Sequence, residues 1–216
     1  MSDIAQEYLV PDGTSSQHIK DLIQARRSFT EEPTRDVTKR FLDSFDWSIY
    51  LAGASVEERL DGRRRQLLWH DLRADSPPCV QTIEQEPGFA WDLPAGPVRK
   101  RVEPVLGVRR LLPLLEVHGR VQTLRLLNSD DKTVVRLLLE DNRFRDPVRD
   151  REGPLAVRLR LLPVRGYEAY MRETAEMLDR DLGLEPAHTT VLPEALAAAG
   201  RRPGDYSSSL DYHLDP

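Results

Sequence analysis

Side chains between Thr34 and Leu162 follow a period of two, most clearly over residues 37–44 and 121–127. Successive side chains of a β-strand point to opposite faces, so this period is typical of strands. Turn sequences separate the short segments: Asp61-Gly62, Ser76-Pro77-Pro78, Pro87-Gly88, Asn128-Ser129-Asp130 and Glu152-Gly153-Pro154. Many short strands without helical crossovers predict an antiparallel sheet, which we expect to form a closed barrel over residues 4–162.

Other segments have the period of an α-helix. Ile19, Leu22 and Ile23 follow the turn at Asp12-Gly13 and predict a helix over residues 15–27. A second helix is expected over residues 167–182, before Gly183, and a short one over residues 192–199. The chain is therefore divided into a β-barrel domain (1–166), C-terminal helices packed on the barrel (167–200) and a polar, linker-like tail (201–216).

Length and composition favour one main soluble domain. The 216 residues are 39% hydrophobic and 31% charged, with a formal net charge of -5, so nucleic acid is not an expected partner. No apolar run approaches the ~20 residues that cross a bilayer, and no signal peptide is evident. Cys79 is the single cysteine, which excludes an intrachain disulfide. These features predict a cytoplasmic protein that does not bind membranes.

The opening residues carry a family resemblance. Residues 3–10 read Asp-Ile-Ala-Gln-Glu-Tyr-Leu-Val and precede a turn and a predicted helix. This segment resembles the start of the CYTH domain of the triphosphate tunnel metalloenzyme superfamily, whose first strand reads Glu-x-Glu-x-Lys. On this chain the two glutamates of that motif fall on Asp3 and Ala5, and its lysine falls on Glu7.

Further segments match the same family in order and spacing. They are residues 41–53, 66–70, 121–125 and 137–142, and the resemblance runs from Asp3 to about Gly166. It implies a mainly β (α+β) fold, an antiparallel triphosphate-tunnel-like β-barrel with flanking helices.

Triphosphate hydrolysis in such a tunnel requires carboxylates that hold Mg²⁺ or Mn²⁺ and basic groups that bind phosphate oxygens. The family's last strand usually reads Glu-x-Glu, whereas this chain has Arg158 and Arg160 at the matching positions. Guanidinium groups facing a divalent cation would oppose its binding. Together with Ala5 and Glu7, they lead us to expect no metal, no cofactor and no catalytic residues.

The basic half of a tunnel site is retained in the sequence. Arg125 holds the place of the family's strand arginine, and His70 that of a strand lysine. The candidate phosphate-binding residues are Arg40, Arg59, Arg125, Arg136, Arg158, Arg160 and His70. For each arginine the alternative is an outward-facing, solvated side chain, and for His70 it is a structural hydrogen-bonded group.

Three functions remain open. The first is a degenerate CYTH-like domain, a non-catalytic module that binds triphosphate or polyphosphate or has a regulatory role. Its linker-like tail resembles the junction to a C-terminal CHAD domain, a helical module associated with polyphosphate. The second is a divergent triphosphatase that binds Mg²⁺ or Mn²⁺ through Glu7, Glu57, Glu103 and Glu140. The third is a structural or protein-interaction scaffold. The inward-facing residues of the first and last strands discriminate among these functions.

Overall fold

The structure is a computed structural model that describes residues 6–11, 13–74, 76–187 and 189–205. The chain forms two compact units that interleave along the sequence. Unit 1 comprises the described residues within Met1–Asp36, Gly119–Arg143 and Pro154–Thr190; unit 2 comprises those within Val37–His118, Phe144–Gly153 and Val191–Pro216. Both units therefore contain strands from the predicted β domain as well as C-terminal helices. No helix in the described part is long and apolar enough to cross a membrane.

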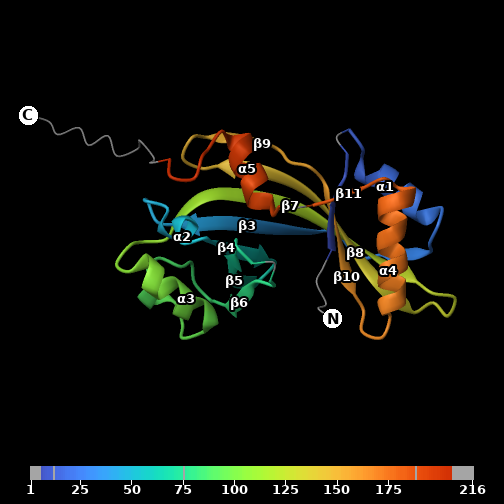
Figure 1. Cartoon of the computed structure of the whole chain (residues 1–216), viewed down its shortest axis with the longest axis horizontal. Helices are drawn as coiled ribbons and strands as arrows, with labels where there is room; N and C mark the ends of the chain where they lie inside the picture. Colours follow the sequence, from blue (N-terminus) through green and yellow to red (C-terminus); the bar gives the residue numbers. More distant parts are fainter. Residues whose placement is uncertain (1–5, 12, 75, 188, 206–216) are drawn as a thin grey trace, which may run out of the picture. The chain divides into compact units, whose positions relative to one another are not determined.

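The strands form an antiparallel sheet, as the sequence predicts (Figure 1). They are β1 (Gln6–Leu9), β2 (Phe29–Glu31), β3 (Arg35–Asp43), β4 (Ala54–Asp61), β5 (Arg64–Asp71), β6 (Cys79–Thr82), β7 (Leu112–Leu127), β8 (Thr133–Asp146), β9 (Arg151–Pro154), β10 (Arg158–Pro163) and β11 (Glu185–Pro186). Hydrogen bonds connect them in the order β11-β1-β10-β8-β7-β3-β4-β5-β6, with β2 on β7 and β9 on β8.

The sheet is not closed, contrary to the expected closed barrel. Its hydrogen-bonded path over the described residues ends at β11 and at β6, which do not pair with each other. Both end strands are short, and Pro186 in β11 has no N–H group with which to extend a ladder. A short edge containing proline resists further pairing. The antiparallel α+β fold with flanking helices is thus confirmed, without closure of the sheet by backbone pairing.

Unit 1 packs one face of its strands against helices. In β1, β8 and β10, alternate residues such as Tyr8, Leu137 and Leu159 are buried in one hydrophobic core. Ile19 and Ile23 of α1 (Ser16–Gln24) enter the same core, and Ser15 caps this helix by accepting a hydrogen bond from the His18 backbone N–H. α4 (Glu168–Glu176) and the π-helical turn Met177–Asp181 complete the cover, so both predicted flanking helices are present.

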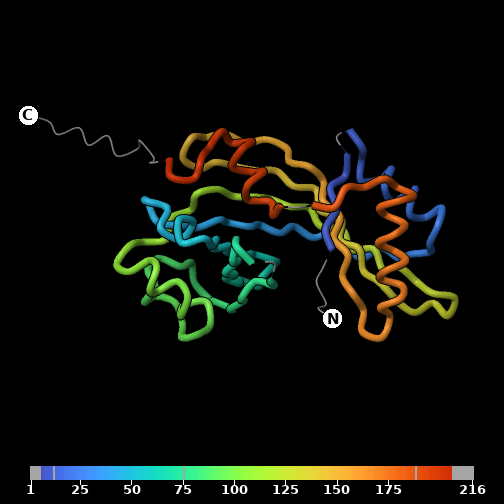
Figure 2. Tube along the Cα trace, viewed as in Figure 1, coloured from blue at the N-terminus to red at the C-terminus, as the bar shows by residue number. Residues whose placement is uncertain are grey.

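Unit 2 packs β3, β4 and β5 against α3 (Pro97–Leu106), as the trace in Figure 2 shows. Leu42, Val56 and Leu67 of the strands share a core with buried residues of α3. Sequence periodicity did not predict this helix, because Pro104 lies inside it. A distant side chain supplies its N-terminal cap: Gln81 Oε1 accepts hydrogen bonds from the Val98 and Arg99 backbone N–H groups at 3.0 and 3.3 Å.

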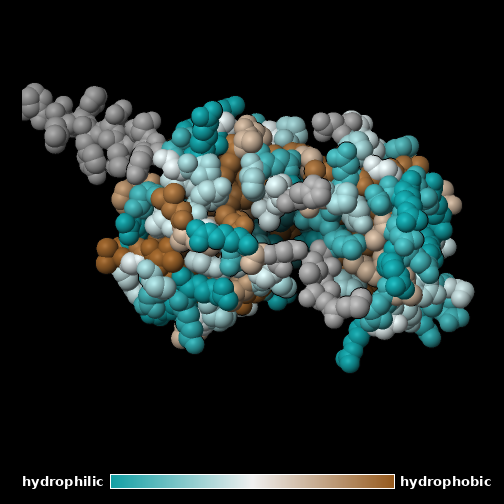
Figure 3. Space-filling model, viewed as in Figure 1, coloured by the Kyte–Doolittle hydropathy of each residue, from teal (hydrophilic) through white to brown (hydrophobic). Residues whose placement is uncertain are grey.

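Two further helices belong to unit 2. They are α2 (Ser48–Leu51) and α5 (Val191–Ala199). The C-terminal carbonyls of α5 accept hydrogen bonds from arginines, Ala199 from Arg151 and Gly200 from Arg149. Hydrophilic residues cover much of the visible face (Figure 3). Phe45, Leu51 and Val108 are exposed hydrophobic residues of unit 2.

Replacement of a core leucine tests this packing. Leu159 is fully buried in unit 1, so Leu159→Ala is expected to lower the free energy of unfolding by about 2–5 kcal/mol. Leu51 is exposed, and Leu51→Ala is expected to change the free energy of unfolding by less than about 0.5 kcal/mol. Urea denaturation measures both; equal effects would contradict the placement of the core.

Candidate functional site

A polar cluster lies on one face of unit 2. Lys39 of β3 is opposite Arg59 of β4, and Ser55 of β4 is opposite His70 of β5. Glu57 lies between Ser55 and Arg59 on the same face of β4, since alternate residues share a face. The intervening residue Val56 belongs to the core with α3. Lys39, Glu57, Arg59 and His70, which we call the Glu57 cluster, therefore occupy the face opposite α3.

Glu57 is the centre of this cluster and is only 3% exposed. Its Oε1 lies 2.7 Å from Arg59 Nε, and its Oε2 lies 3.3 Å from His70 Nε2. Burial alone raises the pKa of Glu57, but Arg59, His70 and Lys39 outweigh it and hold the pKa far below its usual value. Glu57 is consequently ionised, surrounded by basic groups that an anion could also use.

A second polar cluster lies on the face of unit 1 opposite its core. Glu7 of β1 is opposite Arg160 of β10, and Arg158 is opposite Glu140 of β8. The ion pairs run diagonally: Arg158 Nη1 is 3.1 Å from Glu7 Oε1, and Arg160 Nη2 is 2.8 Å from Glu140 Oε1. These four residues, the Arg158–Arg160 cluster, thus balance two guanidinium charges against two carboxylates.

Arg158 is committed to the structure of unit 1. It is only 1% exposed. Besides Glu7, its guanidinium donates to the backbone carbonyls of Thr189 and Thr190 at 2.9 and 3.5 Å. A buried guanidinium needs such acceptors, because an unpaired buried charge is strongly destabilising. The same contacts hold the segment that follows β11.

The four glutamates considered as metal ligands lie beside basic side chains in the described part of the chain. Glu7 and Glu140 form ion pairs with Arg158 and Arg160, while Glu57 is surrounded by basic groups. Glu103 lies on α3 and pairs with Arg99 at 3.6 Å. Over the described ranges, no group of three or more His, Cys, Asp or Glu side chains is placed to hold a metal. Asp3 and Ala5, which match the family's first glutamates, lie outside the described residues.

The remaining predicted phosphate ligands are dispersed. Arg40 lies on the other face of β3, where Glu116, Glu58 and Glu86 are 3.0, 3.5 and 3.6 Å away. Arg125 pairs with Glu32 at 3.7 Å, and both side chains are 43% exposed. Arg136 is opposite Leu162 and is exposed on the same face as Arg160. The structure therefore brings together Arg59 with His70, and Arg158 with Arg160.

Lys39 is a member of the Glu57 cluster that the sequence reasoning missed. It is 7% exposed, although lysine is rarely buried without compensating charge. The period of two places Lys39 on the same face of β3 as Val37 and Phe41. It does not reveal which face of the neighbouring strands carries the other charged residues. Only the register with Arg59 supplies that information.

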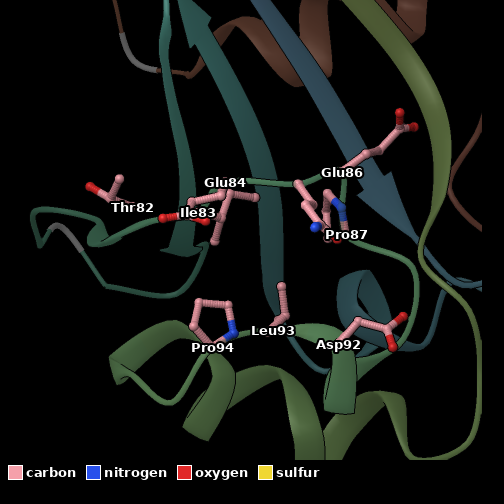
Figure 4. A pocket seen from close by; sticks show the side chains of 9 residues that line it. Thr82, Ile83, Glu84, Glu86, Pro87, Asp92, Leu93 and Pro94 are labelled. Atoms are coloured by element: carbon pink, nitrogen blue, oxygen red, sulfur yellow. The ribbon is translucent and has the colours of Figure 1, made fainter.

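A cavity of about 410 Å³ opens elsewhere in unit 2, between residues 82–87 and 92–94 (Figure 4). Its lining includes the carboxylates Glu84, Glu86 and Asp92. Asp92 accepts a hydrogen bond from the Phe89 backbone N–H at 2.7 Å, as part of a local cap. Like charges repel a phosphate, so this acidic cavity is a poor anion site.

Solved structures share this fold. A candidate adenylyl cyclase from Hippeastrum, described as having a dominant triphosphatase activity, aligns with a TM-score of 0.60 and 10% identity over 92% of this chain and 96% of that one. A candidate adenylate cyclase from Bacillus halodurans gives 0.55 and 12% identity over 88% and 96% of the two chains. One from Vibrio parahaemolyticus gives 0.52 and 11% identity over 90% and 97%.

These likenesses confirm the CYTH-like fold that the sequence resemblance predicts. At 10–12% identity they establish the fold alone. No protein-family model matches the chain, and no curated protein sequence matches it significantly. The function must therefore be argued from the side chains of the two clusters.

Acid titration tests the charge state of Glu57. A carboxyl whose folded pKa lies below its ordinary value of 4.5 contributes stability above pH 4.5 that is lost as the pH falls. Glu57→Gln lacks this contribution, so it is expected to be less stable than the parent at pH 7, with the gap narrowing towards pH 3. Urea denaturation across this range measures the gap. The exposed control Glu84→Gln should show almost none; a constant gap for Glu57→Gln would contradict the assignment.

Proposed function

We propose that this chain is a non-catalytic, cytoplasmic module that binds triphosphate or polyphosphate. The observation that carries the proposal is the Glu57 cluster, in which Lys39, Arg59 and His70 converge on one face of β3, β4 and β5 around a buried anionic group. A cluster that holds a carboxylate by basic side chains has the donors that phosphate oxygens require.

The charge of the Glu57 cluster favours an anion. Lys39 and Arg59 each carry one positive charge beside the single negative charge of Glu57, so basic groups outnumber acidic ones among the residues that define the cluster. The chain as a whole carries -5, so long-range attraction of a polyanion is weak and the local cluster must supply the affinity. Such binding depends on short contacts and is sensitive to salt.

The Arg158–Arg160 cluster supports the absence of metal chemistry. Two arginines neutralise the carboxylates of β1 and β8 that could otherwise serve as hard oxygen ligands. Arg160 retains partial exposure, and Arg136 is exposed on the same face, so unit 1 presents its own basic groups. We therefore propose phosphate binding through Lys39, Arg59 and His70 of unit 2 and, separately, through Arg136 and Arg160 of unit 1, with no metal or other cofactor.

The wider role that we propose is regulatory, next to a polyphosphate-associated helical CHAD domain. Support comes from the likeness of the linker-like tail to the junction with such a domain. A binding module without hydrolysis suits this arrangement, because it can hold a phosphate chain without consuming it. The alternative function is a divergent triphosphatase, which the described activity of the Hippeastrum protein of similar fold favours.

Titration calorimetry with tripolyphosphate at low salt tests the binding function. Lys39→Met keeps the apolar stem but removes the charge, so it is expected to weaken binding about tenfold or more. Lys100→Met removes an equal charge from α3, on the other side of the strands, and should leave affinity unchanged. Parent affinity should fall steeply with added salt and be unaffected by chelator. If the parent shows no binding at low salt, the chain is a scaffold.

Phosphate release distinguishes the binder from the enzyme. With tripolyphosphate or ATP and Mg²⁺ or Mn²⁺, we expect no release above the uncatalysed rate, because the carboxylates are ion-paired. The controls are Glu140→Gln and Glu103→Gln. Metal-dependent release by the parent that either substitution abolishes would establish the triphosphatase and exclude the non-catalytic module.

A further inference from the structure

Glu57 occupies the centre of the proposed anion site, although it carries the same sign of charge as the ligand. Its carboxylate is 3% exposed and lies on β4, between Lys39 on β3 and His70 on β5. One oxygen accepts from Arg59 Nε at 2.7 Å, and the other is 3.3 Å from His70 Nε2. Glu57 thus presents its two oxygens to basic groups in the way that a bound phosphate would.

We propose that Glu57 is an internal counter-anion that competes with the phosphate ligand for Lys39, Arg59 and His70 and so limits the affinity of the site. This inference rests on the proposed binding function and adds a residue that sets its strength. Loss of the Glu57 charge makes the net charge of the cluster more positive by one. Attraction of an anion grows with that net charge.

An ordinary explanation of Glu57 predicts the opposite effect. A buried carboxylate beside an arginine often orients the guanidinium, and its loss would then weaken ligand binding. Glutamine separates the two roles, since its Oε1 can still accept a hydrogen bond from Arg59 Nε while the negative charge is gone. The counter-anion predicts tighter binding by Glu57→Gln, whereas an orienting carboxylate predicts equal or weaker binding.

The strength of the effect should depend on the charge of the ligand. Electrostatic attraction scales with the product of the charges, so a highly charged phosphate chain gains more from the loss of Glu57 than a single phosphate does. Added salt screens the same interaction. The gain should therefore be larger for tripolyphosphate than for orthophosphate, and it should shrink as the ionic strength rises.

The experiment is calorimetric titration of the parent and Glu57→Gln with tripolyphosphate and with orthophosphate, at low and at high salt. We expect Glu57→Gln to bind tripolyphosphate about tenfold more tightly at low salt, with a smaller gain for orthophosphate. The matched control is Glu84→Gln, which removes the same charge from an exposed residue of unit 2 and should match the parent.

Thermal unfolding provides a second readout if Glu57→Gln is unstable. The substitution removes one buried negative charge from beside three basic groups, and a bound polyanion can replace that charge. Tripolyphosphate should therefore raise the Tm of Glu57→Gln by more than it raises that of the parent. If the variant folds only in the presence of tripolyphosphate, the same conclusion follows.

The outcomes separate this inference from the proposed function. Binding by the parent, with equal or weaker binding and no larger Tm shift for Glu57→Gln, overturns the counter-anion but leaves the binding function intact. No binding and no Tm shift for either protein overturns both. Binding by Glu57→Gln alone overturns the binding function of the parent while supporting the competition, because the internal carboxylate then excludes the ligand from the parent.

Discussion

Ion pairs between neighbouring strands allow each unit to place charge on the side of its strands opposite the hydrophobic core. In unit 1, Arg158 and Arg160 of β10 reach Glu7 and Glu140 on the strands at either side. In unit 2, Glu57 is held within β4 by Arg59 and across to β5 by His70. Each carboxylate has a cationic partner, and without such partners burial at these positions would be strongly unfavourable.

The same ion pairs bear on whether the carboxylates of the two clusters are available to bind a metal ion. A metal-dependent phosphatase needs carboxylates that are available to a cation, and here their charges are already neutralised by guanidinium groups. The fold is shared with the candidate adenylyl cyclase from Hippeastrum that is described as having a dominant triphosphatase activity, but a shared fold does not by itself establish a shared activity. In both clusters basic groups lie around carboxylate oxygens, and the proposed phosphate binding rests on this arrangement.

The helix α3 and the surroundings of the strand arginines could be identified only from the three-dimensional structure. α3 was missed because its cap comes from Gln81 on β6 and its interior contains Pro104. Arg40 and Arg59 looked equivalent as strand arginines, yet one contacts three glutamates on the face towards α3 and the other joins the Glu57 cluster. Arg158 looked like a phosphate ligand and is instead buried against backbone carbonyls.

The sequence by itself determined the antiparallel strands, the flanking helices and the family resemblance, because period, turn residues and helix caps are local properties. It also placed arginines where the family has metal-binding glutamates. Only the tertiary structure decided which residues share a face and which charges meet, as the pairing of Lys39 with Arg59 shows. Strand register sets these contacts, and a shift of one residue would move every side chain to the opposite face.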